Sequence, residues 1–486
     1  MTKTIKTNII KYSLFFISSA IILLIMSRCS FLYSASDQGD ANCFFTSAKL
    51  MMNGRILYND FYEQKGPIIY FIHILALHII PNSFHGIYII ETILAFIYCI
   101  FIYKTISLFS TFSDTKNIII TIFGCMSSYI TGYMCHGDEI EELCLPLFAF
   151  LIYHIVKYIK TKESPKIITL LTIGSFIGII FWSKYTIVLP YVMILLYLVY
   201  TNIRNKDYKT LKRAFLYATI SFCIVTSIML IYFLVTHSFK SMIDVYFIEN
   251  LFGYRKELSK ISNTETTSFI SVVLFCLANI ECSNFGNVYL ILLTILILYS
   301  FRYKIKSSNI FYFVVYGYVI SWISISLYGI GWSYYYMYIS VWFGLILTFF
   351  LSILNKKLIY IITPIVASLF ILCIILEADF KQYNYDKKVY EAVEQIVGDK
   401  SICFYNSMNT GFTNNYLTDK YYFTVTNGRR SKIIDQNTKA IKNKEYDYVI
   451  AVASEDYTPK TFYGYKLIAS YTLLQKPNNV ICLFEK

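Results

Sequence analysis

The sequence predicts an α-helical protein that crosses a membrane several times and ends in a small soluble α/β domain. Hydrophobic residues make up 56% of its 486 residues, charged residues make up only 15%, and the mean hydropathy is +0.53. An average soluble domain carries about 25% charged residues. The composition therefore excludes a cytosolic enzyme, a disordered protein and a secreted disulfide scaffold.

Charge is distributed unevenly along the chain, which predicts two domains. Residues 379–486 hold 15 basic and 12 acidic residues in 108 positions, whereas the preceding 378 positions hold only 28 and 18. We therefore predict a polytopic membrane domain at 1–378 and a soluble α/β domain at 379–486. In the second domain the apolar spacing predicts two helices and two strands, namely Asp386–Val397, Ser401–Tyr405, Lys432–Asn443 and Tyr448–Ala453.

About eleven apolar runs are long enough to span a bilayer, because a spanning helix needs about 20 residues at about 1.5 Å each. Pro67–Ile80 and Phe269–Ile280 are shorter, so we expect them to be re-entrant or interfacial. The predicted spans are Ile9–Met26, Gly86–Phe109, Ile118–Met134, Leu143–Ile159, Ile167–Trp182, Thr186–Tyr200, Ala214–Val235, Val288–Phe301, Ile310–Leu327, Tyr335–Leu354 and Leu358–Leu376.

The basic residues predict the orientation of these spans. If both short stretches lie on the outer side, nearly every compact basic cluster falls in a cytoplasmic loop, as membrane proteins prefer; if both span, three middle clusters move outside. We therefore place the N-terminus inside and the C-terminal domain outside, and interpret the first span as a retained anchor rather than a signal peptide. The 43 basic residues against 30 acidic ones are explained by these loops and predict no nucleic-acid partner.

Motifs for metal, redox or nucleotide chemistry are absent from the sequence. The twelve cysteines form no CxxC pair, the six histidines form no HExxH motif, and no Walker loop is present. We expect no cofactor, and we do not expect the chain to hydrolyse ATP.

Two acidic segments on the outer side are the candidate functional residues. The first holds Asp37 and Asp40 after the first span, and the second holds Asp138, Glu139, Glu141 and Glu142 before the fourth span. Carboxylates at membrane depth are costly and usually functional. In the second segment three acids lie at i, i+3 and i+4, on one helical face. One of them is explained as a cap for the following helix, but four in five residues exceed that need and indicate a general base or a cation site.

Motifs after the first acidic segment resemble a known superfamily. Asn53-Gly54, then Tyr58-x-Asp60, then Lys65-Gly66-Pro67 before an apolar stretch resembles the outer loop of the GT-C membrane glycosyltransferases. The closest branch is the bacterial relatives of protein O-mannosyltransferases and of the lipid A aminoarabinose transferase. The segment from Gly137 to Pro146 is similar to the acidic second-loop motif of that branch. Lys184 resembles a lysine found there between two spans, and Tyr334, Tyr335 and Tyr336 lie where relatives often have His-Tyr-Tyr.

The resemblance implies roles for these residues. The donor would be a sugar on a polyprenyl phosphate, and an outer-loop Asp would activate the acceptor hydroxyl with inversion at the anomeric carbon. Asp40 has the family spacing before Gly54, so we prefer it over Asp37, with Asp138, Glu141 and Glu142 as further acidic candidates. The remaining candidates would bind the donor phosphate or the substrate; they are Lys184, Arg55, Lys65 and Tyr334–Tyr336.

The same residues also have purely structural interpretations. Lys184 can be a snorkelling lysine at a helix end, Arg55 and Lys65 can anchor the chain to lipid headgroups, and most of the 46 tyrosines belong to the interfacial belt or the core. A divalent cation held by the carboxylates is possible, but we do not favour one.

The sequence favours an enzyme on the outer face of a bacterial plasma membrane, with membrane lipid around it and a glycan, lipid or protein acceptor. The alternative is a transporter or flippase of lipid-linked sugars without transferase activity. Transporters usually carry polar residues at mid-membrane and show internal repeats. This chain has charge-poor spans, no visible repeat and acids clustered at one face, which favours the glycosyltransferase.

Overall fold

The computed structural model divides the chain into two compact units. Unit 1 consists of Met1–Leu32, Ile87–Thr226 and Thr266–Asp379, and unit 2 consists of Tyr33–Gly86, Ser227–Glu265 and Phe380–Lys486. The structure describes residues 3–33, 36, 39–130, 134, 136–253, 295–297, 308–328, 333–354, 368, 371–372, 374–375, 384–398, 400–405, 430–454, 458–473 and 476–486.

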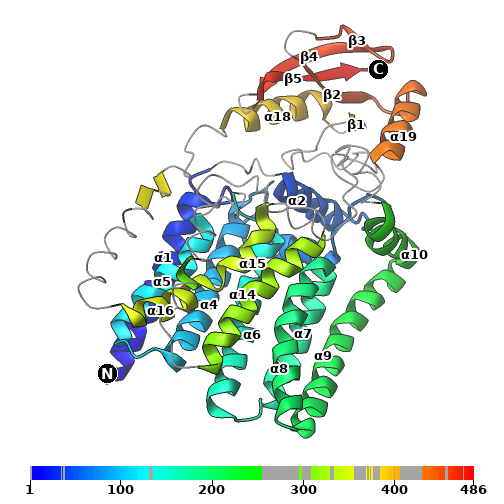
Figure 1. Ribbon diagram of the computed structural model, residues 1–486. Helices are drawn as coiled ribbons and strands as arrows, with labels where there is room; N and C mark the ends of the chain where they lie inside the picture. Colours follow the sequence, from blue (N-terminus) through cyan, green and yellow to red (C-terminus); the bar gives the residue numbers. More distant parts are fainter. Residues whose placement is uncertain are drawn as a thin grey trace. The chain divides into compact units, whose positions relative to one another are not determined.

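Unit 1 is built from long apolar helices (Figure 1). They are α1 (Lys3–Met26), α4 (His85–Phe109), α5 (Asp114–Ile130), α6 (Ile140–Thr161), α7 (Ile167–Ser183), α8 (Val188–Arg204), α9 (Tyr208–Val235, whose last turns belong to unit 2), α14 (Asn309–Tyr328), α15 (Met337–Ser340) and α16 (Phe343–Ile353), with short 3₁₀ turns η2 (Tyr185–Ile187) and η4 (Ser333–Tyr336). Their bounds follow most of the apolar runs of the sequence, although α5 starts before its predicted run and ends at Ile130, and the run Tyr335–Leu354 is divided into η4, α15 and α16.

Local signals set where these helices begin and end. Asp114 in the first turn of α5 suits the positive end of that helix. The α6 helix stops at Lys162, whose φ of 59° is left-handed, and α7 starts directly after Lys166. In the middle of the bundle, Gly344 of α16 packs against Gly124 of α5, where a Cβ on Gly124 would lie 2.5 Å from the Gly344 Cα. Such close approach requires glycine at this crossing.

The fold class predicted from the sequence is confirmed. Six helices in the described part of the chain are long and apolar enough to cross a membrane, and Pro67–Ile79, Ile167–Ser183 and Asn309–Ile325 are shorter apolar helices. The α3 helix (Pro67–Ile79) is as short as expected, and its re-entrant or interfacial placement stays a prediction. The expected spans at 288–301 and 358–376, the short stretch at 269–280 and the domain boundary at 378 lie wholly or largely outside the described residues, so the count of eleven stays a prediction.

Unit 2 contains the segment that follows α1 and the C-terminal tail. Its loop part includes α2 (Gly39–Met52), α3, α10 (Phe239–Met242) and the π-helical η3 (Ile243–Gly253). Tyr58 anchors this part because its ring is 1% exposed and stacks on Phe233 and Tyr246. The tyrosine holds a left-handed φ of 66°, which residues other than glycine seldom adopt.

The tail forms a five-stranded sheet with two helices, as the predicted α/β domain requires. The elements are α18 (Asn384–Val397), β1 (Ile402–Tyr405), α19 (Arg430–Lys442), β2 (Tyr448–Ser454), β3 (Thr461–Phe462), β4 (Tyr465–Leu473) and β5 (Lys476–Glu485). The strand order is β1-β2-β5-β4-β3, with β1 and β2 parallel and the other pairs antiparallel. The sheet core includes Cys403, Val449 and Phe484, against which Ile441 of α19 packs.

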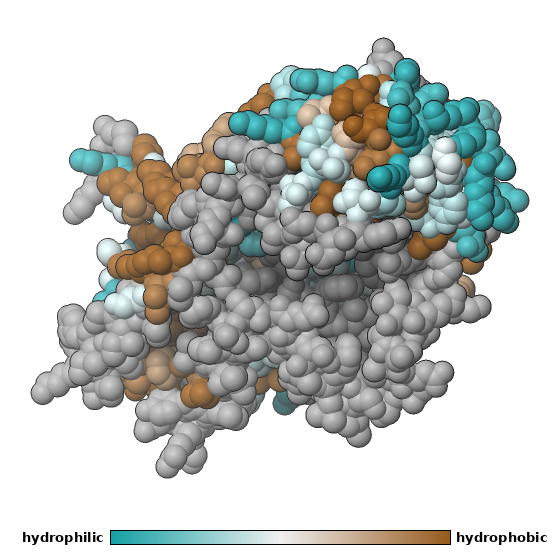
Figure 2. Space-filling view, turned by 90° about the horizontal axis from the view of Figure 1, so that it is seen from above, coloured by the Kyte–Doolittle hydropathy of each residue, from teal (hydrophilic) through white to brown (hydrophobic). Residues whose placement is uncertain are grey.

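The four tail elements that the sequence predicts all lie within one or two residues of their observed bounds, but β3, β4 and β5 were not predicted. Figure 2 shows hydrophilic residues gathered at the upper right of the face drawn, with some hydrophobic residues among them, and mainly hydrophobic residues at the left.

Within unit 1 the N-terminus of α1 and the turns at 162–166 and 205–207 lie at one end of the helices (Figure 1). We predict that this end is cytoplasmic. A cysteine introduced at Lys209 should resist an impermeant maleimide in intact cells and react after permeabilisation. A cysteine introduced at Lys400 in the tail, the matched control, should react in intact cells, and labelling at Lys209 in intact cells would contradict the orientation.

Candidate active site

The acidic segment before α6 is buried and held in an unusual backbone conformation. His136, Gly137 and Asp138 have φ values of 71°, 96° and 62°, three consecutive left-handed residues. Non-glycine residues in this region cost about 1–3 kcal/mol each and persist only where their surroundings hold them. The four acids Asp138, Glu139, Glu141 and Glu142 are all at most 2% exposed.

Glu91 of α4 is the side chain that holds this turn. Its Oε1 accepts a hydrogen bond from the backbone N–H of Asp138 at 2.7 Å, and its Oε2 accepts one from the Ser27 hydroxyl at 2.7 Å. The Asp138 N–H also donates to Glu142 Oε2 at 3.1 Å. These contacts fix the start of α6, whose first turn carries Glu141 and Glu142.

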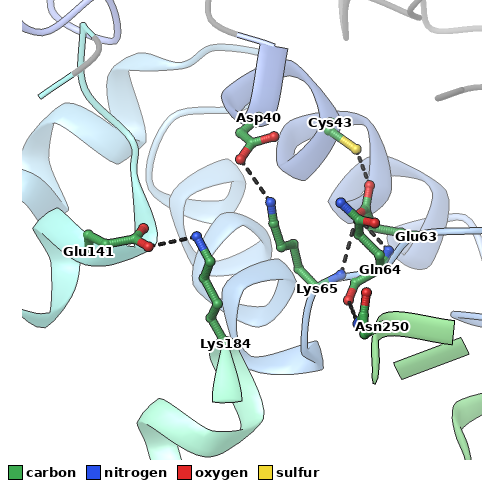
Figure 3. Close-up of polar contacts among 8 residues, drawn as sticks. All are labelled: Asp40, Cys43, Glu63, Gln64, Lys65, Glu141, Lys184 and Asn250. Carbon is green, nitrogen blue, oxygen red and sulfur yellow. Dashed lines mark hydrogen bonds and ion pairs between the residues drawn. The ribbon is translucent and has the colours of Figure 1, made fainter. Parts of the chain in front are cut away.

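Glu141 and Glu142 therefore point to different partners although they are neighbours in sequence. Glu142 faces the turn through its contact with Asp138, whereas Glu141 Oε1 accepts a hydrogen bond from Lys184 Nζ at 2.6 Å (Figure 3). The predicted common face of Asp138, Glu141 and Glu142 is thus divided between a backbone contact and an ion pair.

Lys184 is a buried cation, 9% exposed, at the C-terminal cap of α7. Besides its ion pair with Glu141, its Nζ lies 4.4 Å from the ring centroid of Tyr334 and 4.6 Å from that of Tyr335. Aromatic faces attract an ammonium group, more strongly where water is excluded. A snorkelling lysine keeps its ammonium in water, so the observed contacts disfavour that interpretation of Lys184.

The three tyrosines after residue 333 do not share one environment. Tyr334 and Tyr335 cover Lys184, whereas Tyr336 is fully buried and packs edge-on against Trp322 with 5.6 Å between ring centroids. Tyr336 is therefore placed to support the short η4 turn that presents the other two rings.

Asp40 lies in the first turn of α2 and forms an ion pair with Lys65. The Lys65 Nζ to Asp40 Oδ2 distance is 2.8 Å, and the two side chains are 10% and 18% exposed (Figure 3). Glycine at 66 and proline at 67 begin α3 directly after this lysine. Asp37, the other candidate in this segment, lies outside the described residues.

The loop before α3 is fixed by a network of buried polar contacts. Glu63 Oε1 accepts from the backbone N–H of Gln64 at 2.6 Å, and its Oε2 accepts from the Cys43 thiol. Asn250 Nδ2 donates to the Gln64 carbonyl at 2.7 Å (Figure 3). Burial raises the pKa of the Glu63 carboxyl, an effect that the nearby Lys65 ammonium opposes.

In this structure the Arg55 side chain forms a hydrogen bond within the same loop. Its Nη2 donates to the carbonyl of Asp60 at 3.0 Å, and the Asp60 carboxylate accepts from the backbone N–H of Ile56 at 2.7 Å. Tyr62 donates to Glu249 of η3 at 2.8 Å.

Sequence reasoning missed Glu91, Glu63 and Glu249. A signal was available for Glu91, since it is the one acid in the apolar run Gly86–Phe109 and an acid inside such a run usually has a specific partner. In the described part of the chain, no group of three or more His, Cys, Asp or Glu side chains has the arrangement of a metal site.

Comparisons with known proteins agree with this architecture. Residues 64–232 match the sequence profile of the family described as dolichyl-phosphate-mannose-protein mannosyltransferase. The fold matches the crystal structure of ArnT from Cupriavidus metallidurans in the apo state, with a TM-score of 0.61 and 9% identity over 99% of this chain and 98% of that one. The chain therefore has the fold of ArnT, and one segment of it matches the mannosyltransferase profile.

A second ArnT structure from the same organism, bound to undecaprenyl phosphate, matches with a TM-score of 0.60 and 10% identity over 97% of this chain and 98% of that one. No curated protein sequence matches the chain. The shared fold and the matched segment support the predicted GT-C resemblance, and the apolar helices agree with the predicted multi-pass membrane architecture.

The turn before α6 gives a testable prediction. A Cβ on Gly137 would lie 2.6 Å from Ser27 Oγ and 2.9 Å from Glu91 Oε1, whereas a Cβ on Gly54, which also has a positive φ, would meet nothing within 4 Å. Gly137→Ala should therefore lower the apparent Tm of the purified protein clearly more than Gly54→Ala, which adds only backbone strain of about 1 kcal/mol. Equal shifts of the two variants in a thermal unfolding assay would show that Glu91 and Ser27 do not confine the turn.

Proposed function

We propose that the protein is a glycosyltransferase that moves a sugar from a polyprenyl-phosphate donor to a hydroxyl of a cell-surface acceptor. The reaction would take place on the outer face of a bacterial plasma membrane, with the N-terminus in the cytoplasm and the C-terminal domain outside. The observation that carries the proposal is the buried cation Lys184, paired with Glu141 and covered by two tyrosine rings. The family profile over residues 64–232 and the fold of a protein crystallised with undecaprenyl phosphate support it.

Lys184 is placed to stabilise the leaving group of such a transfer. When the anomeric carbon–oxygen bond breaks, negative charge develops on the lipid phosphate, and a cation already in place and shielded from water stabilises it. Without donor, Glu141 balances the charge of Lys184. The donor is a phosphodiester with a single negative charge, and cleavage of the anomeric C–O bond turns its phosphate into a monoester that can carry two. This gain of charge would draw Lys184 toward the leaving phosphate and away from Glu141.

Asp40 is our candidate for the general base of this reaction. An acceptor hydroxyl is a weak nucleophile, and a positioned base that takes its proton contributes about 10²–10⁴-fold in rate. Asp40 is partly exposed and keeps its place through Lys65. We propose that Lys65 orients the carboxylate, that the acceptor donates its proton to Asp40, and that the oxygen attacks the anomeric carbon opposite to the leaving phosphate, with inversion.

The acceptor stays within the classes that the sequence suggests, a glycan, a lipid or a protein. The proposal contains no step through a metal ion.

The role of Asp40 can be tested by isosteric replacement. Asp40→Asn keeps the size of the side chain but cannot take a proton, so sugar transfer by the purified protein should fall about 10²–10⁴-fold while donor binding persists. Asp114→Asn is the matched control, because Asp114 also lies in the first turn of a helix and accepts a hydrogen bond from a tyrosine. A near wild-type rate for Asp40→Asn would remove Asp40 from the mechanism and direct attention to Asp37 or Asp138.

The role of Lys184 can be tested by separating charge from anchoring. Lys184→Ala should raise the donor KM and lower kcat. Lys184→Arg should change both constants less, because the positive charge matters more than the shape of the group. Lys116→Ala, which removes an exposed lysine in the first turn of α5, should leave both constants unchanged. Normal donor kinetics in purified Lys184→Ala would return Lys184 to the interpretation as a membrane anchor.

A further inference from the structure

A cavity of about 530 Å³ lies in the row of helices α6, α7, α8 and α9 of unit 1. Its lining residues run along α8 from Val188 to Asn202, which corresponds to about 21 Å at 1.5 Å per residue. Leu170, Ile173 and Phe181 of α7 form another wall. This length exceeds half of the roughly 30 Å hydrocarbon layer, so the cavity can hold a lipid chain along its axis.

The cavity reaches the surface that would face lipid. Leu196 of α8 and Phe215 of α9 line it and are 48% and 75% exposed, and only 11% of the apolar window of α9 is buried. At the crossing of α7 and α9, Gly174 and Gly178 bring the two helices together, since a Cβ on Gly174 would lie 2.0 Å from the Ala218 carbonyl oxygen. An apolar space open to the bilayer fills with hydrocarbon rather than with water.

Polar lining residues gather at one end of the cavity. Tyr158 donates to Asn202 Oδ1 at 2.8 Å, and the Thr210 hydroxyl lies 2.8 Å from the Ser164 hydroxyl. The opposite end is lined by Phe181, Val188 and Phe222, which are all apolar. An amphiphile would therefore place its headgroup at the end formed by Tyr158, Asn202 and Thr210.

That polar end is surrounded by positive charge. Residues 157–166 and 204–213 contain nine basic residues and only two acidic ones, Glu163 and Asp207. Within the described residues none of the nine forms an ion pair, and most are exposed. They are Lys157, Lys160, Lys162, Lys166, Arg204, Lys206, Lys209, Lys212 and Arg213.

We propose that this cavity binds an anionic phospholipid of the cytoplasmic leaflet, with one acyl chain between α7, α8 and α9 and the phosphate at the basic end. Basic pockets between membrane helices on the cytoplasmic side suit such headgroups, and each basic residue near the surface contributes about 1 kcal/mol. The assignment of this end to the cytoplasm rests on the proposed orientation. The charge preference rests only on the residues around the cavity.

The test measures which lipids stay with the full-length protein. The protein is equilibrated with vesicles of equal phosphatidylglycerol and phosphatidylcholine content, extracted in detergent and analysed by native mass spectrometry. Phosphatidylglycerol should remain bound in clear preference. The triple variant Lys166→Gln, Lys209→Gln and Lys212→Gln should retain at least tenfold less phosphatidylglycerol than the wild type, because each removed charge weakens binding about fivefold.

A second pair of variants tests the cavity itself. Ala214 lines the cavity, so Ala214→Phe should fill it and abolish retention, whereas Ile220→Phe on the exposed side of α9 should not, because Ile220 does not line the cavity. The triple variant changes only exposed side chains, so it keeps the test decisive if Ala214→Phe fails to fold. Equal retention of both lipids, unchanged retention in the triple variant, or displacement of phosphatidylglycerol by undecaprenyl phosphate would each overturn the proposal.

Discussion

A lysine ammonium removed from water needs an anion within reach, and this requirement explains the surroundings of both Lys184 and Lys65. Breaking a buried ion pair by removing one partner typically costs about 3–5 kcal/mol, because the remaining charge stays buried and uncompensated. Lys184, 9% exposed, meets the requirement with Glu141, and Lys65 meets it with Asp40. In the proposed mechanism Glu141 is a counter-ion that the lipid phosphate can replace, whereas Lys65 keeps Asp40 in place as the base.

The position of Glu141 depends on residues that do not belong to its ion pair with Lys184. Glu91 and Ser27 hold the left-handed turn at His136, Gly137 and Asp138, and this turn fixes where α6 begins. One turn of helix then separates the roles of neighbouring acids, since Glu142 stabilises the turn and Glu141 reaches Lys184. The strain of two left-handed residues, His136 and Asp138, is therefore the structural cost of positioning the Glu141 carboxylate.

The sequence predicted the membrane class and several helix bounds because apolar runs and basic loops act locally. It also singled out Asp40, Glu141 and Lys184 as candidates, because charges beside apolar runs are conspicuous; the structure places them in two ion pairs, and their catalytic roles stay a prediction. It could not predict which acid meets which cation, since Glu141 and Glu142 differ only in the direction their side chains take from α6. It placed Arg55 and Tyr336 among substrate ligands, whereas in this structure Arg55 holds the loop at Asp60 and Tyr336 packs on Trp322. Strands β4 and β5 depend on pairing with each other and with β2, which no local pattern specifies.

The replaceable counter-ion is the central claim, and the thermal stability of Glu141→Gln tests it most directly. Without donor lipid, this variant should unfold at a lower temperature than the wild type, because Lys184 keeps its charge and loses its anion. Undecaprenyl phosphate should then raise the Tm of Glu141→Gln by more than it raises the Tm of the wild type, because the phosphate supplies the missing charge. Equal stabilisation of both proteins by undecaprenyl phosphate would show that the phosphate does not take the place of Glu141 and would contradict the account.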